Sequence, residues 1–439
     1  MKILFISMSP IQKGVSIGNT FLNVFEDFPD VQFFSVYTKN GYPDSSIERA
    51  FQITDKQLLK RLLHRTKTVG RTVPERDGQE NAPAEDKMVT FARKKRYIPM
   101  FWAQSLLWLP PYWKSKALHT FLDEVQPDLL FTILSDSVPL NKLIWHIQGY
   151  LQKPLVVYAW DNNYTLQLGL TSPLVFLNRC INRHYMRKTV QKAEQLYVIS
   201  EIQKQDYEKA FGVSCKILTK SADFSGKPPV KSKYNSPLQL VFTGNIGTNR
   251  WKSLAMIAKA LERINANGVR AQLRIYTATP LTEKMHQSLH SGKNSYIMGS
   301  IPASEVPRIQ SNADMLVHVE ATDSKNKRAV RQSFSTKLVD YFKAARPILA
   351  VGPREVASID HLIRNGCALT GETVEEIRQA IESVLDNPDK LNTLSEQAYA
   401  CGKKNHDTAV MHHMLQTDLE KITEENNLED ITNQRGKQN

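Results

Sequence analysis

The chain has 439 residues and a formal net charge of +13 at pH 7, and this length suits two domains of about 200 residues each. Its four cysteines are widely spaced without a Cys-x-x-Cys motif, so the sequence indicates neither a disulfide framework nor a zinc site and favours a reducing cytoplasm. No apolar run approaches the roughly 18 to 20 residues that span a bilayer, so membrane-spanning helices are not expected. The basic excess, larger in the first half, is compatible with nucleic acid, an anionic membrane or phosphorylated ligands.

Short apolar runs alternate with amphipathic stretches in the first half of the chain. They predict buried strands at residues 3–6, 129–134, 155–160 and 196–199. The first run is too short for a signal peptide and no small-residue cleavage site follows it, so we interpret it as the first strand. This alternation is typical of a doubly wound parallel sheet, and we assign residues 1–224 to a first Rossmann-like domain.

Residues 44–120 do not resemble another strand–helix unit, and we predict that they form an insertion with its own task. A basic run is followed there by an apolar stretch rich in aromatic residues. One explanation is that the rings pack under the first domain. Taken together, however, cations beside tryptophans are typical of a bilayer interface. We therefore predict a membrane-contact surface that comprises Arg93, Lys94, Lys95, Arg96, Trp102, Trp108 and Trp113.

A polar, proline-rich segment without periodicity separates the two halves and predicts an interdomain linker at residues 225–237. A second series of apolar runs follows and predicts strands at residues 240–243, 273–277, 296–298, 315–319 and 348–351. We assign residues 238–405 to a second Rossmann-like domain. A C-terminal helix is predicted at residues 406–423, and residues 424–439 are polar enough to be disordered.

Residues 240–254 combine a strand, a turn that contains two glycines and the start of a helix. Gly244 and Gly247 allow the backbone to turn closely. A diphosphate at the helix N-terminus would meet free amides and the positive end of the helix dipole, and Arg250 lies in the first turn, where it could pair with phosphate oxygens. The alternative is an ordinary strand–helix turn with an exposed arginine.

Residues 332–352 bring a cation, a carboxylate and an aromatic ring together. Lys337, Asp340 and Tyr341 fall at positions i, i+3 and i+4, so they share one helical face. The segment resembles the donor-site helix of GT-B glycosyltransferases of family 4, the type found in bacterial surface-polysaccharide synthesis. In that family two glutamates eight positions apart flank the helix. Asp340 occupies the second glutamate position and Gln332 the first.

The resemblance implies roles for residues of the second half. In the family, a Gly-Arg and a Lys-Gly pair bind the donor diphosphate. Asn245 stands at the arginine position and Arg250 at the lysine position, so Lys337 is the best replacement for the second cation. The implied catalytic cations are therefore Arg250 and Lys337, and Asp340 would accept hydrogen bonds from a ribose. The remaining donor-binding residues that the resemblance implies are Gly244, Asn245, Gly247, Gly299, Ile301, Glu320, Ser335 and Thr336.

The first half contributes candidates for the acceptor side. Gly14 and Gly18 follow the first strand, as the family's glycine loop does, although the double glycine of that loop is absent. Asp161 resembles the second aspartate of an Asp-x-x-Asp-x-Trp segment in related enzymes and is a third catalytic candidate. Its alternative role is that of a helix cap.

We therefore predict an α/β protein with the GT-B fold, in which two Rossmann-like domains with doubly wound parallel sheets are separated by a cleft. The resemblance implies a glycosyltransferase that moves a sugar, with retention, from a nucleotide-sugar to a saccharide or lipid-linked saccharide in polysaccharide or glycolipid biosynthesis. We expect a cytoplasmic protein that lies peripherally on the inner face of an anionic membrane, and no nucleic-acid partner.

No cofactor is expected. Because no Asp-x-Asp motif occurs, a metal clamp on the diphosphate is not indicated either. Cations and the helix dipole would neutralise the leaving group instead. Two other classes remain open. A sugar-nucleotide epimerase shares the fold and would turn over the donor alone. A catalytically silent GT-B partner subunit, suggested by Gln332 in place of a glutamate, would bind without transfer.

Overall fold

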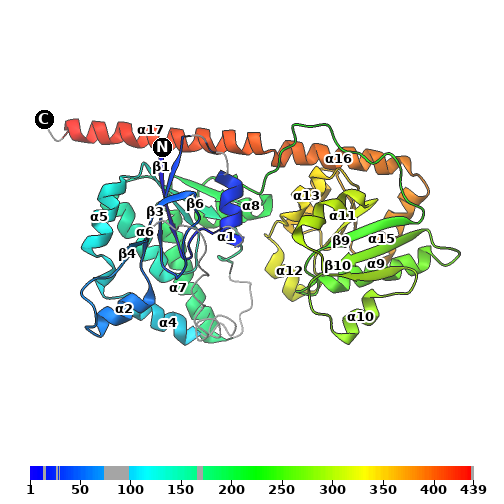
Figure 1. The fold of residues 1–439 in the computed structure, drawn as a ribbon, viewed down its shortest axis with the longest axis horizontal. Helices are drawn as coiled ribbons and strands as arrows, with labels where there is room; N and C mark the ends of the chain where they lie inside the picture. The colour runs from blue at the N-terminus through cyan, green and yellow to red at the C-terminus, as the bar shows by residue number, and fades with distance from the viewer. Residues whose placement is uncertain (13–15, 26–27, 29, 74–97, 166–171, 437–439) are drawn as a thin grey trace. The chain divides into compact units, whose positions relative to one another are not determined.

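The computed structural model describes residues 1–12, 16–25, 28, 30–73, 98–165 and 172–436. The chain forms two compact units, each with its own sheet and apolar core (Figure 1). Unit 1 comprises residues 1–198, 204–218 and 412–439, and unit 2 comprises residues 199–203 and 219–411. The prediction of two α/β units built on largely parallel sheets is confirmed.

Unit 1 contains an eight-stranded sheet in the order β4-β3-β2-β1-β5-β6-β7-β8, in which every neighbouring pair is parallel except β3–β4. Buried apolar side chains of β1, β5 and β6 form its centre, as the sequence predicts. The strands are β1 (Lys2–Ser7), β2 (Gln32–Tyr37), β3 (Ile47–Gln52), β4 (Arg71–Val73), β5 (Leu129–Ile133), β6 (Leu155–Ala159), β7 (Gln195–Val198) and β8 (Cys215–Ile217). The helices are α1 (Ser16–Phe25), α2 (Asp55–Leu62), α4 (Ile98–Leu107), η1 (Pro111–Trp113), α5 (Lys116–Val125), α6 (Val138–Leu151), α7 (Pro173–Val190) and α8 (Glu201–Phe211).

The segment predicted as an insertion, residues 44–120, instead extends this sheet in part. β3 pairs with β2 in parallel, and β4 pairs with β3 antiparallel. The prediction of a separate segment was wrong for these strands. The reason is that β3 exposes two of its first three side chains and β4 has only three residues, so neither shows a clear apolar run.

Two of the predicted membrane-contact tryptophans are core residues, which is a correction. Trp108 and Trp113 are 1% and 4% exposed. The indole of Trp108 donates to Asp55 Oδ1 at 2.7 Å, and that of Trp113 donates to the Trp108 carbonyl at 3.0 Å, so burial leaves neither N–H group unsatisfied. Trp102 is half-buried and donates to Asn178 Oδ1 at 2.9 Å. The predicted contacts Arg93, Lys94, Lys95 and Arg96 lie outside the described residues.

Unit 2 contains a six-stranded parallel sheet in the order β11-β10-β9-β12-β13-β14. The five strands predicted for this half are all present. They are β9 (Leu238–Thr243), β10 (Ala271–Tyr276), β11 (Ser295–Gly299), β12 (Met315–Val319) and β13 (Ile348–Val351), and β14 (Leu369–Gly371) completes the sheet. The helices are α9 (Arg250–Ile264), α10 (Glu283–Leu289), η2 (Ala303–Glu305), α11 (Val306–Asn312), α12 (Ser324–Val330), α13 (Lys337–Lys343), α14 (Ala357–Arg364), α15 (Val374–Leu385) and α16 (Asp389–His406).

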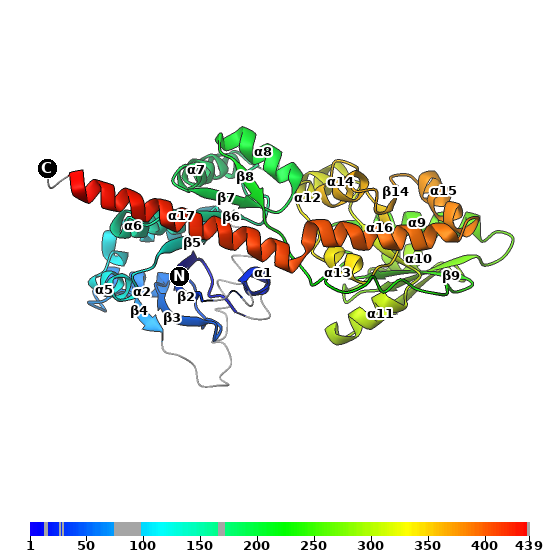
Figure 2. The ribbon, with the colours of Figure 1, turned by 90° about the horizontal axis from the view of Figure 1, so that it is seen from above.

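The C-terminal helix α17 spans Thr408–Gly436, so the prediction of disorder from residue 424 was wrong as far as residue 436. From residue 412 the helix belongs to unit 1 and lies along it (Figure 2). Leu415 and Leu419, one turn apart, are buried, and Asp418 accepts from the Tyr197 hydroxyl at 2.8 Å. These tertiary contacts stabilise a helix whose remaining residues are mostly polar. Within the described part of the chain, no helix combines the length and the apolar character needed to cross a membrane.

Candidate functional site

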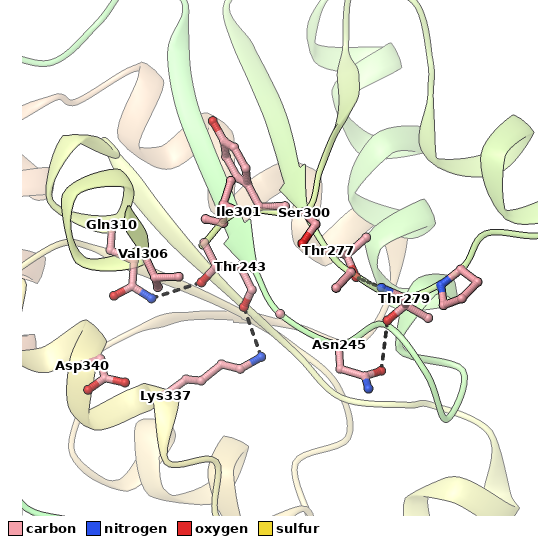
Figure 3. Close-up of a pocket in the computed structure, with 14 residues that line it drawn as sticks. Thr243, Asn245, Thr277, Thr279, Ser300, Ile301, Val306, Gln310, Lys337 and Asp340 are labelled. Atoms are coloured by element: carbon pink, nitrogen blue, oxygen red, sulfur yellow. Dashed lines mark hydrogen bonds between the residues drawn. The ribbon is translucent and has the colours of Figure 1, made fainter. Parts of the chain in front are cut away.

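Two adjoining cavities open at the carboxyl ends of the unit 2 strands, where parallel α/β sheets commonly bind ligands. The larger has a volume of about 490 Å³ and the smaller about 270 Å³, and Asn245 and Lys337 line both. Figure 3 shows the larger cavity, to which several elements contribute. Its walls come from β9 and its turn (Thr243, Gly244, Asn245), the turn after β10 (residues 276–280), the loop after β11 (Ser300, Ile301), α11 (Val306, Gln310) and α13 (Lys337, Asp340).

Lys337 is the cation of the larger cavity. It is the first residue of α13, and its Nζ donates to the Thr243 carbonyl at 3.1 Å (Figure 3). Burial, with the charge of Arg250, lowers the pKa of Lys337. The side chain crosses Gly244 so closely that a Cβ atom on that glycine would lie 1.6 Å from Nζ. Gly244 also has a φ of +141°, which side chains rarely allow, so this lysine position requires a glycine.

Asp340 lines the same cavity from the next turn of α13. Its side chain is 45% exposed, and its Oδ1 accepts from Lys220 Nζ at 2.6 Å. Tyr341, which the sequence places on the same helical face, is buried and lines the smaller cavity, where its hydroxyl donates to the Val317 carbonyl at 3.2 Å. The structure therefore brings Lys337 and Asp340 together in the larger cavity. Lys220 was not predicted as a site residue, and its sequence neighbourhood gives no signal for this contact.

Arg250 lines the smaller cavity, where it forms a two-pronged ion pair with Glu320. Its Nε and Nη2 donate to Glu320 Oε2 and Oε1 at 3.0 and 3.3 Å. The Glu320 side chain is only 3% exposed, and burial raises its pKa while Arg250 and Lys337 oppose that rise. Arg250 thus already has a carboxylate partner, and among the predicted cations it is Lys337 that lines the larger cavity.

Replacing Arg250 by alanine should lower the free energy of unfolding by about 3 kcal/mol at pH 7, because Glu320 would remain buried without its cation. The remaining burial raises the folded-state pKa of Glu320 further above its ordinary value of 4.5, so the stability loss should grow as pH rises past that value and shrink as Glu320 is protonated below it. Urea unfolding at pH 7 and pH 4 measures both effects. Arg250→Ala/Glu320→Gln should recover most of the loss. An equal loss at both pH values would contradict this account.

The N-terminus of α9 differs from the prediction. The amides of Arg250, Trp251 and Lys252 already donate to loop carbonyls at 3.2, 3.2 and 3.0 Å, so they are not available to a diphosphate. Asn249 occupies the N-cap position with a φ of +63°, but its side chain donates to Asp323 at 2.9 Å instead of capping the helix. The predicted anion site at these amides was therefore wrong, because the turn folds back on itself.

The other donor-side candidates divide between the two cavities. Asn245 lines both, Gly244 and Ile301 line the larger, and Glu320, Ser335 and Thr336 line the smaller. Gly247 and Gly299 line neither. Gly299 ends β11 with a φ of +79°, beside the lining residue Ser300. Gln332 is buried and also lines neither cavity.

Several polar residues of the larger cavity were not predicted. Thr243 Oγ1 accepts from Gln310 Nε2 at 3.0 Å, and Thr279 Oγ1 donates to Asn245 Oδ1 at 3.3 Å (Figure 3). Thr277 Oγ1 accepts from the Thr279 amide at 3.1 Å. The contacts of Thr277, Thr279 and Asn245 hold hydroxyl and amide groups across the cavity from Asp340 (Figure 3). The only sequence signal was that Thr277 ends a predicted strand and Thr279 follows it closely.

The three candidates of the first half belong to unit 1 and are not among the residues that unit 2 brings together. Asp161 is exposed after β6, and its Oδ1 accepts from the amide of Asn162 at 2.7 Å. Gly18 lies in α1 against the backbone of Gln12, where a Cβ atom would be 1.8 Å from the carbonyl oxygen, so its role there is close packing. Gly14 lies outside the described residues.

Comparison with known proteins now adds to this geometry. Residues 237–387, which contain both cavities, match the sequence family described as Glycosyl transferases group 1. No curated protein sequence matches the chain.

Among solved structures, HepE from Anabaena in complex with UDP has a TM-score of 0.61 and 12% sequence identity, with 96% of this chain and 100% of that chain covered. The sucrose-phosphate synthase of Thermosynechococcus elongatus has a TM-score of 0.58 and 10% identity, with 96% and 98% covered. A glycosyltransferase from Rickettsia africae has a TM-score of 0.57 and 10% identity, with the same coverage. These likenesses show the GT-B fold, and with the family match they identify an enzyme of glycosyl transfer.

Proposed function

Because the chain is a glycosyltransferase, we propose that the larger cavity of unit 2 holds a nucleotide-sugar donor and that the enzyme belongs to family 4. The observation that carries this proposal is the pair Lys337 and Asp340 on one wall of a cavity of about 490 Å³, a volume typical of small-molecule sites. The cation suits a diphosphate and the carboxylate suits ribose hydroxyls. The opposite wall of threonine and asparagine groups supplies further hydrogen-bond partners.

The proposed chemistry is transfer with retention. The bond between the anomeric carbon and the diphosphate oxygen breaks, a bond to the acceptor oxygen forms on the same face, and the acceptor's proton passes to the departing diphosphate. Lys337 stabilises the charge that develops on the diphosphate. Ser300 and Ile301, beyond Gly299, lie at the end of β11 and would contact the base. Because HepE was solved with UDP and with UDP-glucose, uridine is the base to test first.

For the acceptor we propose a saccharide or a lipid-linked saccharide, in a polysaccharide or glycolipid pathway on the cytoplasmic face of a membrane. Support comes from the family resemblance and from the basic excess of the first half. Asp161, exposed at the end of β6, is the proposed acceptor-side group of unit 1. The alternative of a catalytically silent subunit was based on Gln332. Gln332 lines neither cavity, so the structure gives that alternative no particular support.

A thermal-shift panel tests the donor proposal. Ligands that bind only the folded state raise its melting temperature by mass action. UDP, GDP, CDP and ADP, each also as its common sugar conjugates, are compared at equal concentration. One nucleotide series should stabilise the protein and the others should not. No shift with any member at millimolar concentration would overturn the proposal.

The variant Asp340→Ala should bind the preferred nucleoside diphosphate at least tenfold more weakly, because a ribose would lose its acceptor. Titration calorimetry measures the affinity. Lys220→Met is the matched control, since it removes the ion pair with Asp340 but leaves the carboxylate in place. Unchanged affinity in Asp340→Ala would assign this carboxylate to the helix surface.

A further inference from the structure

Most of the large apolar side chains that are strongly exposed in the described part of the chain lie in one region of unit 1. They belong to α2, α4 and α7 or follow α2 and α4 closely, and we call this region the α2/α4/α7 face. Leu106 and Leu109 are 63% and 59% exposed, which is unusual for leucine. The other members are Leu59, Leu62, Leu63, Met100, Phe101, Leu174, Phe176, Leu177 and Ile181.

The three helices are neighbours in the fold (Figure 1). α4 contacts both α2 and α7. Gln104 Nε2 donates to Asp55 Oδ2 at 2.8 Å and joins α4 to α2, while the Trp102 indole donates to Asn178 and joins α4 to α7. These polar side chains therefore form hydrogen bonds between the helices, whereas the leucine and phenylalanine side chains are exposed to solvent.

Basic residues outnumber acidic residues in the three helices of this face. α4 has no charged residue and α7 no acidic residue. The one acid of α2, Asp55, accepts from the side chains of Trp108 and Gln104. Exposed cations accompany the leucines on and after α2, namely Lys56, Lys60, Arg65 and Lys67. An apolar surface with cations beside it complements an anionic lipid bilayer.

A groove of about 740 Å³ adjoins this face at Leu109. Trp145 and Tyr185 stack in its wall with ring centroids 5.3 Å apart, and Lys114 and Lys142 also line it. No acidic residue is among the residues that line the groove. Aromatic rings beside lysines suit the headgroup level of a membrane, next to the acyl region that exposed leucines would enter.

We propose that the α2/α4/α7 face docks unit 1 on an anionic membrane, with Phe101 and Leu106 in the acyl region and the cations at the lipid phosphates. This replaces the surface predicted around Trp108 and Trp113, both of which are core residues. Such docking would bring the enzyme to the membrane in which a lipid-linked acceptor is anchored. The purpose of the docking rests on the proposed function, but the docking itself can be measured without a nucleotide-sugar donor.

Vesicle sedimentation tests the docking. The full chain should co-sediment with vesicles of phosphatidylglycerol and phosphatidylcholine, but not with phosphatidylcholine alone, and high salt should weaken the binding. Phe101→Ser/Leu106→Ser should reduce the apparent affinity at least tenfold. Lys60→Glu/Arg65→Glu should do the same, since each cation near an anionic surface strengthens binding roughly fivefold. Leu428→Ser, which changes a leucine 64% exposed on α17 of the same unit, should have no effect.

Two results would overturn the proposal. One is equal recovery of the wild-type chain in the supernatant with both vesicle types at low salt. The other is a wild-type dimer that Phe101→Ser/Leu106→Ser converts to monomer while neither protein binds vesicles, because the face would then be an interface between copies. The nucleotide-induced thermal shift is measured on every variant. It should persist in all of them, so failure of docking is distinguishable from failure of the donor proposal.

Discussion

Replacing Lys337 by methionine should lower kcat/KM for glycosyl transfer about 100- to 1000-fold, the range found for loss of one preorganised charge donor. The ammonium group is held by the Thr243 carbonyl at 3.1 Å on a half-buried side chain, so it need not reorganise when charge develops on a departing diphosphate. Methionine keeps the length of the side chain and removes only the charge. Steady-state kinetics with the donor identified by thermal shift measure the effect.

Lys343→Met is the control for this variant. Lys343 lies on the same helix but is exposed and lines neither cavity, so its loss should leave kcat/KM within about twofold, as is usual for surface substitutions. Circular dichroism should show both variants folded. If Lys337→Met and Lys343→Met had the same activity, the diphosphate could not be placed at Lys337.

Gly244→Ala should cause a loss of similar size although it adds a single methyl group. That methyl would lie 1.6 Å from Lys337 Nζ, so the lysine must leave its position, and the φ of +141° adds backbone strain. Activity should fall about 100-fold or more, and the melting temperature should also fall. Kinetics and thermal unfolding of the purified variant test both effects.

A double-mutant cycle separates the loss of the lysine position from general damage. In a Lys337→Ala background there is no long side chain for the new methyl to displace. Gly244→Ala should therefore cost little further activity there, and the two changes should be strongly non-additive. Gly268→Ala is a matched control, because Gly268 has the same φ of +141° but open space at its Cβ. Additive losses in the cycle would contradict the proposed contact between Gly244 and Lys337.

Much of the fold was predictable because buried parallel strands are continuous apolar runs. All nine strands predicted from such runs are present, for example β12, which is buried at every position. Most of the strands that were missed lack this signal, but β2 was missed although five of its six residues are buried. β3 has two exposed charged residues directly after its buried first residue, and β4, β8 and β14 have three residues each.

The site was predictable only where local spacing decides it. Lys337 and Asp340 share a helical face by their spacing, and both line the larger cavity. The contacts that define their environment are between residues far apart in the sequence. Lys337 meets Thr243 across 94 positions, and Asp340 meets Lys220 across 120. No local sequence pattern predicts contacts between residues so far apart in the chain.

The membrane surface illustrates the same limit. An apolar, aromatic stretch does not reveal which of its rings are buried. Trp108 is buried because its indole meets Asp55, 53 positions earlier, whereas Leu106 and Leu109 on either side of it stay exposed. The segment does contain exposed apolar residues, but two of the three tryptophans that the prediction named as contacts form part of the core.

Titration calorimetry of UDP, or of the nucleoside diphosphate that stabilises the protein most, tests the central claim most directly. The claim is that the cavity between the β9 turn and α13 binds the donor nucleotide. Wild type and Lys343→Met should bind with the same affinity, while Lys337→Met and Gly244→Ala should each bind at least tenfold more weakly. Equal affinity in all four proteins would place the nucleotide elsewhere and contradict the claim.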